Sequence, residues 1–241
     1  MSGASIVALL IAAVPTIIAI TLHEAAHGYA AWALGDDTAK RAGRLSLNPL
    51  VHVDRIGTIL VPGVLLIGQL ITTGQVNFMF GWAKPVPVAA WRLKNPRRAM
   101  MIVAAAGPAM NLFLAFLGAL AFNVLPLVPP SLESGTFTLI YYFMLANIGL
   151  GLFNLLPIPP LDGGRIAVGL LPEPLAVRWA KLERAGFAIV LILVYLVPGF
   201  VADVFHVKFD PVRSVLVNVM DPVMNGLLWA AGNPLASVGG A

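Results

Sequence analysis

The stretch His23-Glu24-Ala25-Ala26-His27 lies within an apolar segment, residues 5–34, and decides how the rest of the chain must fold. The Gly35-Asp36-Asp37 turn ends this segment, so we predict one helix from about Ser5 to Leu34. On a helix, His23 and His27 lie one turn apart on the same face, and both imidazoles can reach one metal ion. Glu24 can contact the water that such an ion activates. The sequence therefore predicts a metal site with Glu24 as its catalytic base.

The composition is that of a membrane protein. Of 241 residues, 59% are hydrophobic and only 11% are charged, which is too little polar surface to cover a water-soluble globule. Several uncharged runs exceed the roughly 20 residues that a spanning helix requires. The chain has no cysteine, so metal ligands must come from histidine and carboxylate side chains. We expect a mainly α-helical polytopic bundle with about 4–6 membrane segments.

Three further strong helices are predicted over residues 99–125, 137–156 and 185–197, with prolines marking their ends. Residues 42–48 and 75–82 alternate loosely with a period of two, and we predict short strands there. Such strands beside the metal could hold an extended substrate by β-augmentation.

The basic residues orient the helices. Lys and Arg number nine in residues 35–98, none in 126–136 and four in 157–184, so we place the first and third segments in the cytoplasm. A single crossing by residues 56–73 would separate the motifs that must meet. We therefore predict a re-entrant or membrane-surface hairpin there, on the cytoplasmic side. The protein is expected in the cell membrane as a multi-pass protein with its site near the cytoplasmic face, and not as a nucleic-acid binder.

Two histidines leave a tetrahedral zinc site short of a protein ligand. The candidates for the third ligand are Asp162, His52, Asp54 and His206. Asp162 follows a proline-rich break at a helix end, and broken backbone at membrane depth usually lines a site. The alternative for Asp162 is an N-cap of a short helix over residues 165–171. His206 lies beyond the last strong helix and is expected on the far side of the membrane.

Three motifs together resemble the site-2 protease family of intramembrane zinc metalloproteases. They are His23-Glu24-Ala25-Ala26-His27, Gly107-Pro108-Ala109-Met110-Asn111 and Asn154-Leu155-Leu156-Pro157-Ile158-Pro159-Pro160-Leu161-Asp162-Gly163-Gly164. The resemblance covers about residues 17–171. It implies that one zinc ion per chain is bound by His23, His27 and Asp162, and that Glu24 activates water. Residues 48–54, with Gly57 and Thr58, resemble the small prokaryotic members without a PDZ domain, and no polar insertion of that size is present.

Other motif residues have two interpretations each. His52 could gate or transiently bind the metal, or it could be a loop histidine hydrogen-bonded to backbone. Asn154 could donate to the substrate backbone or to the oxyanion, or it could serve helix packing. Gly107, Pro108 and Asn111 are expected to let their helix approach the His23 helix closely.

We therefore expect an intramembrane zinc metalloprotease that cuts a peptide bond within or next to a transmembrane segment of a membrane-protein substrate. The chain is expected to be one integral-membrane domain, residues 1–241, with a core over 5–171 and C-terminal helices over 184–241. Three alternatives are a transporter, a catalytically idle metal-binding scaffold, and an unrelated membrane enzyme that trims lipidated carboxyl termini. Substrate identity, the path of residues 203–241 and whether copies form a homo-oligomer stay open.

Overall fold

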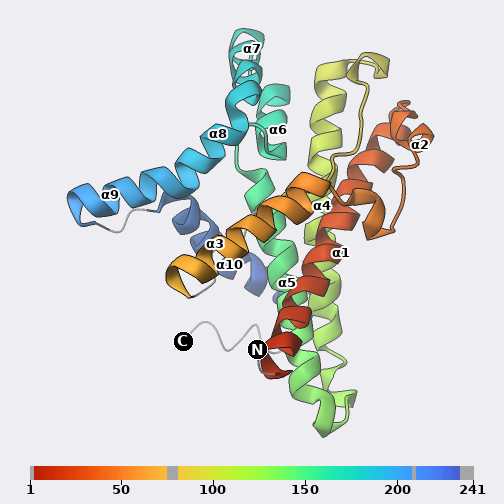
Figure 1. Ribbon diagram of the computed structural model, residues 1–241. Coiled ribbons are helices and arrows are strands. Elements are labelled where there is room, and N and C mark those ends of the chain that lie inside the picture. Colours follow the sequence, from red (N-terminus) through yellow and green to blue (C-terminus); the bar gives the residue numbers. More distant parts are fainter. Residues whose placement is uncertain (1–2, 75–80, 208–209, 234–241) are drawn as a thin grey trace.

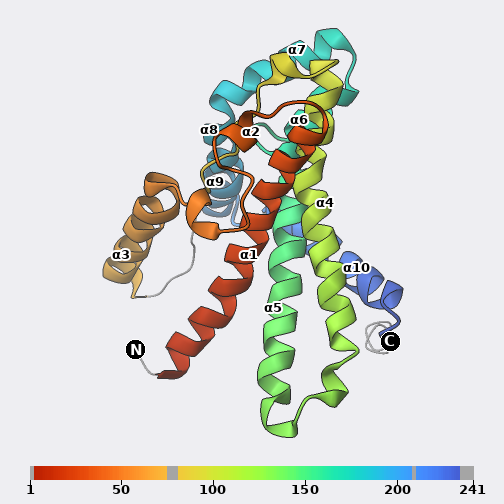
Figure 2. The same cartoon turned by 90° about the vertical axis from the view of Figure 1, so that its right-hand side faces the viewer.

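A three-helix bundle forms the centre of the protein, for which a computed structural model describes residues 3–74, 81–207 and 210–233 (Figure 1). Helices α1 (Gly3–Ala33), α4 (Pro96–Phe122) and α5 (Pro130–Leu155) pack against one another. α1 and α5 run in the same direction and α4 runs opposite to them (Figure 2). Helix α6 (Asp162–Leu170) packs against α4 and α5. The predicted helices at these positions are confirmed, and α4 and α5 each begin at a proline, which suits the first helical turn.

The remaining helical elements surround this bundle. On the amino-terminal side they are α2 (Thr38–Arg41), η1 (Pro49–His52), η2 (Arg55–Leu60), α3 (Val61–Thr73) and η3 (Ala90–Arg92). Further along they are η4 (Leu125–Leu127), α7 (Glu173–Lys181), η5 (Leu182–Ala185), α8 (Gly186–Leu191), η6 (Ile192–Leu196), α9 (Val197–Phe205) and α10 (Pro211–Ala230). α10 packs against α5 and α4 and closes an apolar core around Met144 and Ile148, both fully buried.

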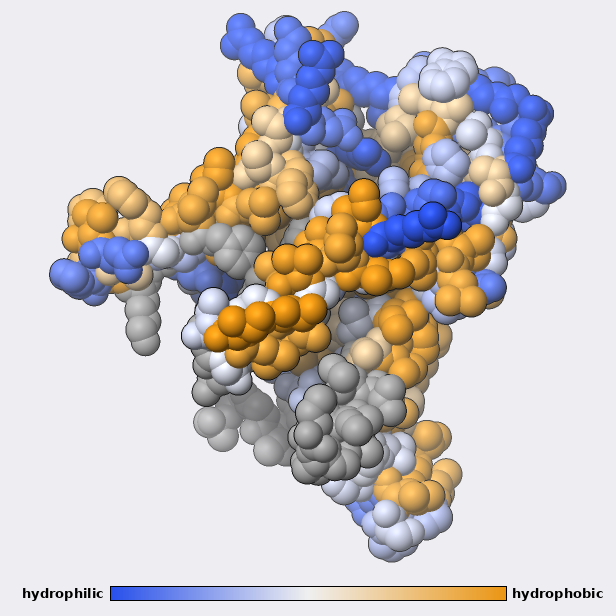
Figure 3. Space-filling view, viewed as in Figure 1, coloured by the Kyte–Doolittle hydropathy of each residue, from blue (hydrophilic) through white to orange (hydrophobic). Residues whose placement is uncertain are grey.

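Four stretches of helix among the described residues are long and apolar enough to cross a membrane. They are Arg55–Thr72, Pro96–Phe122, Pro130–Leu155 and Glu173–Phe205. Hydrophilic residues gather at one end of the molecule, over α7 and the connection after α1, whereas hydrophobic residues cover α3 and much of the middle (Figure 3). The α4–α5 turn lies at the opposite end (Figure 2). This distribution is the one expected of a multi-pass membrane protein.

The strand predicted over residues 42–48 is wrong. These residues form a turn and irregular backbone: the Arg44 amide donates to the Ala39 carbonyl, and the Leu45 side chain fills the space beside Gly28. The segment is therefore fixed by α1 and α2 rather than by a neighbouring strand. Of the second predicted strand, residues 75–80 lie outside the described residues and Gly81 and Trp82 are irregular.

The hairpin predicted for residues 56–73 is a single run of helix instead. Pro62 lies where π-helical η2 passes into α3. The Gly57 carbonyl, five residues earlier, accepts from the Trp82 amide in place of the amide that Pro62 lacks, so the proline does not break the helix. α3 runs across the direction of the three-helix bundle (Figure 1), and the Ile67 and Ile71 side chains on it are exposed, as is Ile59 of η2. Whether this helix crosses the bilayer or lies along its surface stays a prediction.

A buried carboxylate ties the end of α1 to the chain that returns beside it. Asp36 is fully buried, and its carboxylate accepts from the Ala89 amide at 2.6 Å and from the amide of Thr38 at 3.0 Å. The Thr38 hydroxyl donates to the same carboxylate. Burial alone would raise the pKa of Asp36, but these hydrogen bonds and Arg92 outweigh it and lower the pKa below 3.8. The ionised carboxylate therefore stabilises the fold.

We expect Asp36→Asn to lower stability by about 1 to 3 kcal/mol at pH 7, because one oxygen facing an N–H donor becomes a second donor. A lowered folded pKa means that the stabilisation is present above 3.8 and is lost as the pH falls through the folded value. Thermal unfolding in detergent should therefore show a gap between wild type and variant that is constant from pH 7 to 5 and narrows below about 4.

The matched control is Asp54→Asn. Both backbone amides that bind Asp54, those of Ile56 and Gly57, donate to the single oxygen Oδ1, which asparagine retains. An Asp54→Asn loss as large as that of Asp36→Asn, or a gap that widens in acid, would contradict the assignment.

Candidate metal centre

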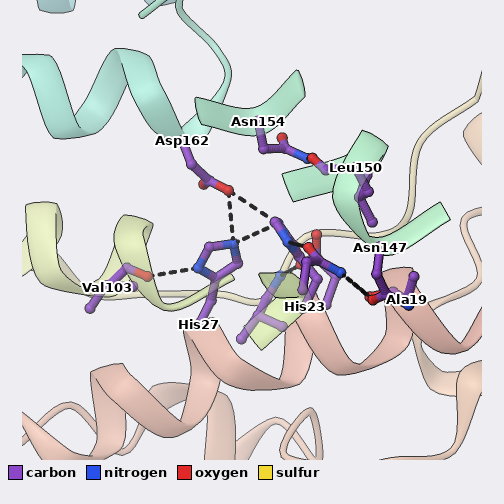
Figure 4. A network of polar contacts seen from close by, with 11 residues as sticks. Ala19, His23, His27, Val103, Asn147, Leu150, Asn154 and Asp162 are labelled. Carbon is purple, nitrogen blue, oxygen red and sulfur yellow. Dashed lines mark hydrogen bonds and ion pairs between the residues drawn. The ribbon is translucent and has the colours of Figure 1, made fainter. Parts of the chain in front are cut away.

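Three side-chain atoms from α1 and α6 converge on one another (Figure 4). Nε2 of His23 lies 3.1 Å from Oδ2 of Asp162, and Nε2 of His27 lies 3.3 Å from the same oxygen. The two Nε2 atoms are 3.1 Å apart. Of the candidates for a third ligand, the structure thus brings Asp162 to the two histidines.

The spacing of these atoms fits a tetrahedral zinc ion. Zinc bonds to imidazole nitrogen and carboxylate oxygen are about 2.0 to 2.2 Å long, so tetrahedral ligands lie roughly 3.3 to 3.5 Å apart. His23 and Asp162 are buried, and Oδ2 of Asp162 has no hydrogen-bond partner among the described residues. A buried carboxylate oxygen without a donor is costly unless a cation satisfies it. The donor set therefore fits the zinc implied by the sequence.

Helix α4 holds both imidazoles from behind. Nδ1 of His27 donates to the Val103 carbonyl at 2.7 Å, since a carbonyl can only accept. Nδ1 of His23 lies 2.6 Å from Oδ1 of Asn111. Gly107 lies between these two residues, and a Cβ there would stand 2.5 Å from the His27 ring and 2.6 Å from the His23 ring. The absence of a side chain at Gly107 is what leaves room for both rings beside α4.

The break between α5 and α6 presents the carboxylate. α5 ends at Leu155, and Asp162 is the first residue of α6, whose N-cap residue is Leu161. The alternative of an N-cap is therefore not what the structure shows. A Cβ on Gly163 would stand 2.3 Å from the Leu155 and Leu156 carbonyl oxygens, so only glycine lets α6 begin against the end of α5.

Glu24 faces a cavity beside the three ligand atoms. The cavity has a volume of about 370 Å³. Its lining includes Ile20, His23, Glu24, Gly81, Trp82, Ala83, Leu150, Phe153, Asn154, Leu161 and Phe187. One carboxylate oxygen of Glu24 accepts from the Val86 amide at 3.2 Å. The second oxygen has no hydrogen-bond donor among the described residues and can accept a proton. Trp82 and Phe187 meet edge to face in the cavity wall.

The other predicted site residues lie in different surroundings. Asn154 lines the cavity, and its amide donates to the Leu150 carbonyl at 3.0 Å (Figure 4). His52 is buried, donates through Nε2 to the Ser46 carbonyl and is not among the three converging ligands, which is the backbone-bonded alternative. Asp54 caps η2, and His206 ends α9 in a left-handed conformation. The roles predicted for Asn154 and His52 stay predictions.

The structure adds groups that the sequence did not identify. Asn147 of α5 is fully buried, and its side-chain oxygen accepts from Asn111 at 3.0 Å. A carboxamide in an apolar helix is a signal that could have identified it. The Val86 amide and the Val103 carbonyl are backbone groups, and no residue type in the sequence announces them.

We expect Gly107→Ala to weaken zinc binding roughly tenfold or more, because the added methyl must displace both imidazoles. The measurement is zinc per chain, by elemental analysis, after dialysis against a series of buffered zinc concentrations. Gly118→Ala is the matched control. Gly118 lies on α4 as well, and a Cβ there would stand 2.6 Å from Met144 of α5, away from the ligands. Gly118→Ala should lower the melting temperature without changing the zinc content. If both variants lost the same amount of zinc, the weaker zinc binding of Gly107→Ala would come from distortion of α4 and not from displaced imidazoles.

Comparisons with known proteins agree with this site. The family model described as Peptidase family M50 matches residues 129–196. The chain is 41% identical over 184 residues to "Putative zinc metalloprotease YwhC" of Bacillus subtilis (strain 168), covering 73% of this chain and 76% of that protein. It is 29% identical over 198 residues to "Putative zinc metalloprotease Rip2" of Mycobacterium tuberculosis (strain ATCC 25618 / H37Rv), covering 80% and 71%. No solved structure matches significantly. The chain belongs to peptidase family M50, the site-2 protease family of zinc metalloproteases.

Proposed function

We propose that this protein hydrolyses a peptide bond within or next to a transmembrane segment of a membrane-protein substrate, using His23, His27 and Asp162 to hold zinc. The observation that carries the proposal is the convergence of these three ligand atoms beside Glu24, in a bundle of apolar helices. Asp162 begins α6, which packs against α7, where hydrophilic residues gather (Figure 3), and this supports a position of the site near the cytoplasmic face of the cell membrane.

The chain's own groups divide the work of hydrolysis. His23, His27 and Asp162 would hold the zinc ion, which would supply a Lewis acid to polarise a carbonyl and acidify water. Glu24 takes the proton of the attacking water on its free carboxylate oxygen and passes it to the leaving amine, while the Val86 amide holds the other oxygen. Asn154 lines the same cavity and is placed to donate to the substrate backbone or to the oxyanion.

The chain beside the cavity offers one edge to an extended substrate. Amides at alternate positions point inward: Trp82 donates to the Gly57 carbonyl, Lys84 to the His52 carbonyl, and Val86 to Glu24. The intervening positions face the other way, and two of them are the prolines 85 and 87. Ala83 lines the cavity and makes no hydrogen bond through its amide among the described residues. We propose that the carbonyls and the Ala83 amide on this edge bind the substrate backbone.

Glu24→Gln should reduce cleavage of co-expressed single-span membrane proteins by about 10²- to 10⁴-fold while leaving zinc content unchanged, because it removes a base and not a ligand. Asp162→Asn should lower both zinc content and cleavage. Glu133→Gln, at the far end of α5, serves as the control for the loss of a carboxylate. Zinc binding with equal cleavage by wild type and Glu24→Gln would sink the protease mechanism. Zinc binding without any cleavage would favour the idle scaffold.

Ala83→Pro should reduce cleavage and leave zinc content unchanged, since it deletes an amide donor on the outer edge, beside the cavity. Proline fits an extended segment that already contains two prolines, so the fold should survive. Ala83→Ser retains the amide and should cleave like wild type. The readouts are the amount of cleaved substrate and the zinc content of the same preparations. Full cleavage by Ala83→Pro would remove this edge from the substrate path.

A further inference from the structure

We infer that Asn111 is a positioning residue, which together with Asn147 holds His23 in the one tautomer whose Nε2 lone pair faces the metal. The inference rests on the proposed zinc site and assigns Asn111 a role beyond the helix packing expected from its motif. It concerns this chain's carboxamides and can fail while the zinc site stands.

A chain of three side chains links α1, α4 and α5. Nδ1 of His23 lies 2.6 Å from Oδ1 of Asn111, and Nδ2 of Asn111 donates to Oδ1 of Asn147 at 3.0 Å and to the Ala19 carbonyl at 3.2 Å. Nδ2 of Asn147 donates in turn to the Phe143 carbonyl at 2.9 Å. Both asparagines are fully buried, so water does not compete for these groups (Figure 4 shows Asn147, Ala19 and His23).

Backbone carbonyls determine the donor-to-acceptor direction of every hydrogen bond between these three side chains. The Phe143 and Ala19 carbonyls can only accept, so the nitrogen of each asparagine must face them. That orientation leaves Oδ1 of Asn147 as an acceptor for Asn111, and Oδ1 of Asn111 as an acceptor for His23. Nδ1 of His23 must then carry the proton, and Nε2 has the lone pair. Reversing either amide would set an oxygen against a carbonyl oxygen in a buried site.

The second histidine is oriented in a different way. His27 donates from Nδ1 directly to the Val103 carbonyl, a backbone group that mutation of a side chain cannot remove. The tautomer of His23 depends instead on a side-chain amide, whose orientation needs Ala19 and Asn147. His27 thus has a backbone partner, whereas His23 depends on a relay of two side chains, Asn111 and Asn147. Only this relay can be tested by substitution. Outer partners of histidine ligands typically change metal affinity by about 10- to 100-fold.

The experiment compares zinc affinity, Co²⁺ absorption and thermal stability in detergent-solubilised full-length protein. Asn111→Leu should weaken zinc binding by about 10- to 100-fold and change the visible absorption of the Co²⁺-loaded protein. Asn111→Asp keeps an oxygen for His23 but loses both donors, so it should be less stable yet bind zinc within a few-fold of wild type. Retained affinity in a destabilised variant is a result that helix packing alone does not produce.

The relay predicts a further dependence. Asn147→Leu should weaken zinc binding less than Asn111→Leu, and the double variant should bind like Asn111→Leu alone, because Asn147 acts through Asn111. Asn123→Leu is the matched control, since that residue also joins α4 to a backbone carbonyl, of Ala231, far from the ligands. It should leave zinc affinity and Co²⁺ absorption unchanged.

The outcomes separate this inference from the proposed function. If wild type binds zinc and Asn111→Leu binds it with the same affinity, only the positioning role is overturned. Equal affinity losses in Asn111→Leu and Asn111→Asp, or additive losses with Asn147→Leu, also overturn it and return Asn111 to packing. If wild type binds no zinc, and His23→Ala has the same zinc content as wild type, the proposed metal site is contradicted instead.

Discussion

Three acceptor atoms that face one another, two on buried side chains and one on the partly buried His27, are the constraint on which the rest of the structure depends. The Nε2 atoms of His23 and His27 and the Oδ2 atom of Asp162 lie 3.1 to 3.3 Å apart. In an interior of low dielectric, such a group is stable only around a cation. Two of its members come from α1 and the third comes from α6, so the chain must return to the same end of the bundle after α4 and α5. The short helix α6, begun at Asp162 itself, meets this requirement.

One stripe of α4 supports the site from behind. Val103, Gly107 and Asn111 are four residues apart and therefore lie on one face of the helix. The first and third fix the two imidazole rings, and the glycine between them gives the rings their space. The same face continues through Ala115 and Ala119, both fully buried in the apolar core with α5 and α10. Packing and ligand orientation are thus functions of the same helical surface, in which a change of one side chain affects both.

The parts of this architecture that are local in sequence could be predicted. The spacing of His23 and His27 sets their common face on any helix, and Asp162 was identified because prolines and glycines break the chain around it. Predictions that needed a spatial neighbour failed. The alternation over residues 42–48 lacked a strand partner, and Pro62 was accommodated at a change of helical geometry rather than forcing a turn. Asn147 could not be paired with Asn111 from the sequence, since the contact depends on how α4 and α5 pack.

Irregular backbone beside the site is tolerated because almost all of its polar groups are accounted for. Such backbone inside a membrane must be buried in protein or line a cavity. In the chain from Gly81 to Ala89, the inward amides of Trp82, Lys84 and Val86 are bonded, and Ala89 is bonded to Asp36. Prolines 85 and 87 have no amide to satisfy. The prolines that exclude a central strand therefore also remove the outward donors that lipid could not satisfy. Among positions 83, 85 and 87, only Ala83 therefore keeps an amide, and Ala83 lies at the cavity wall.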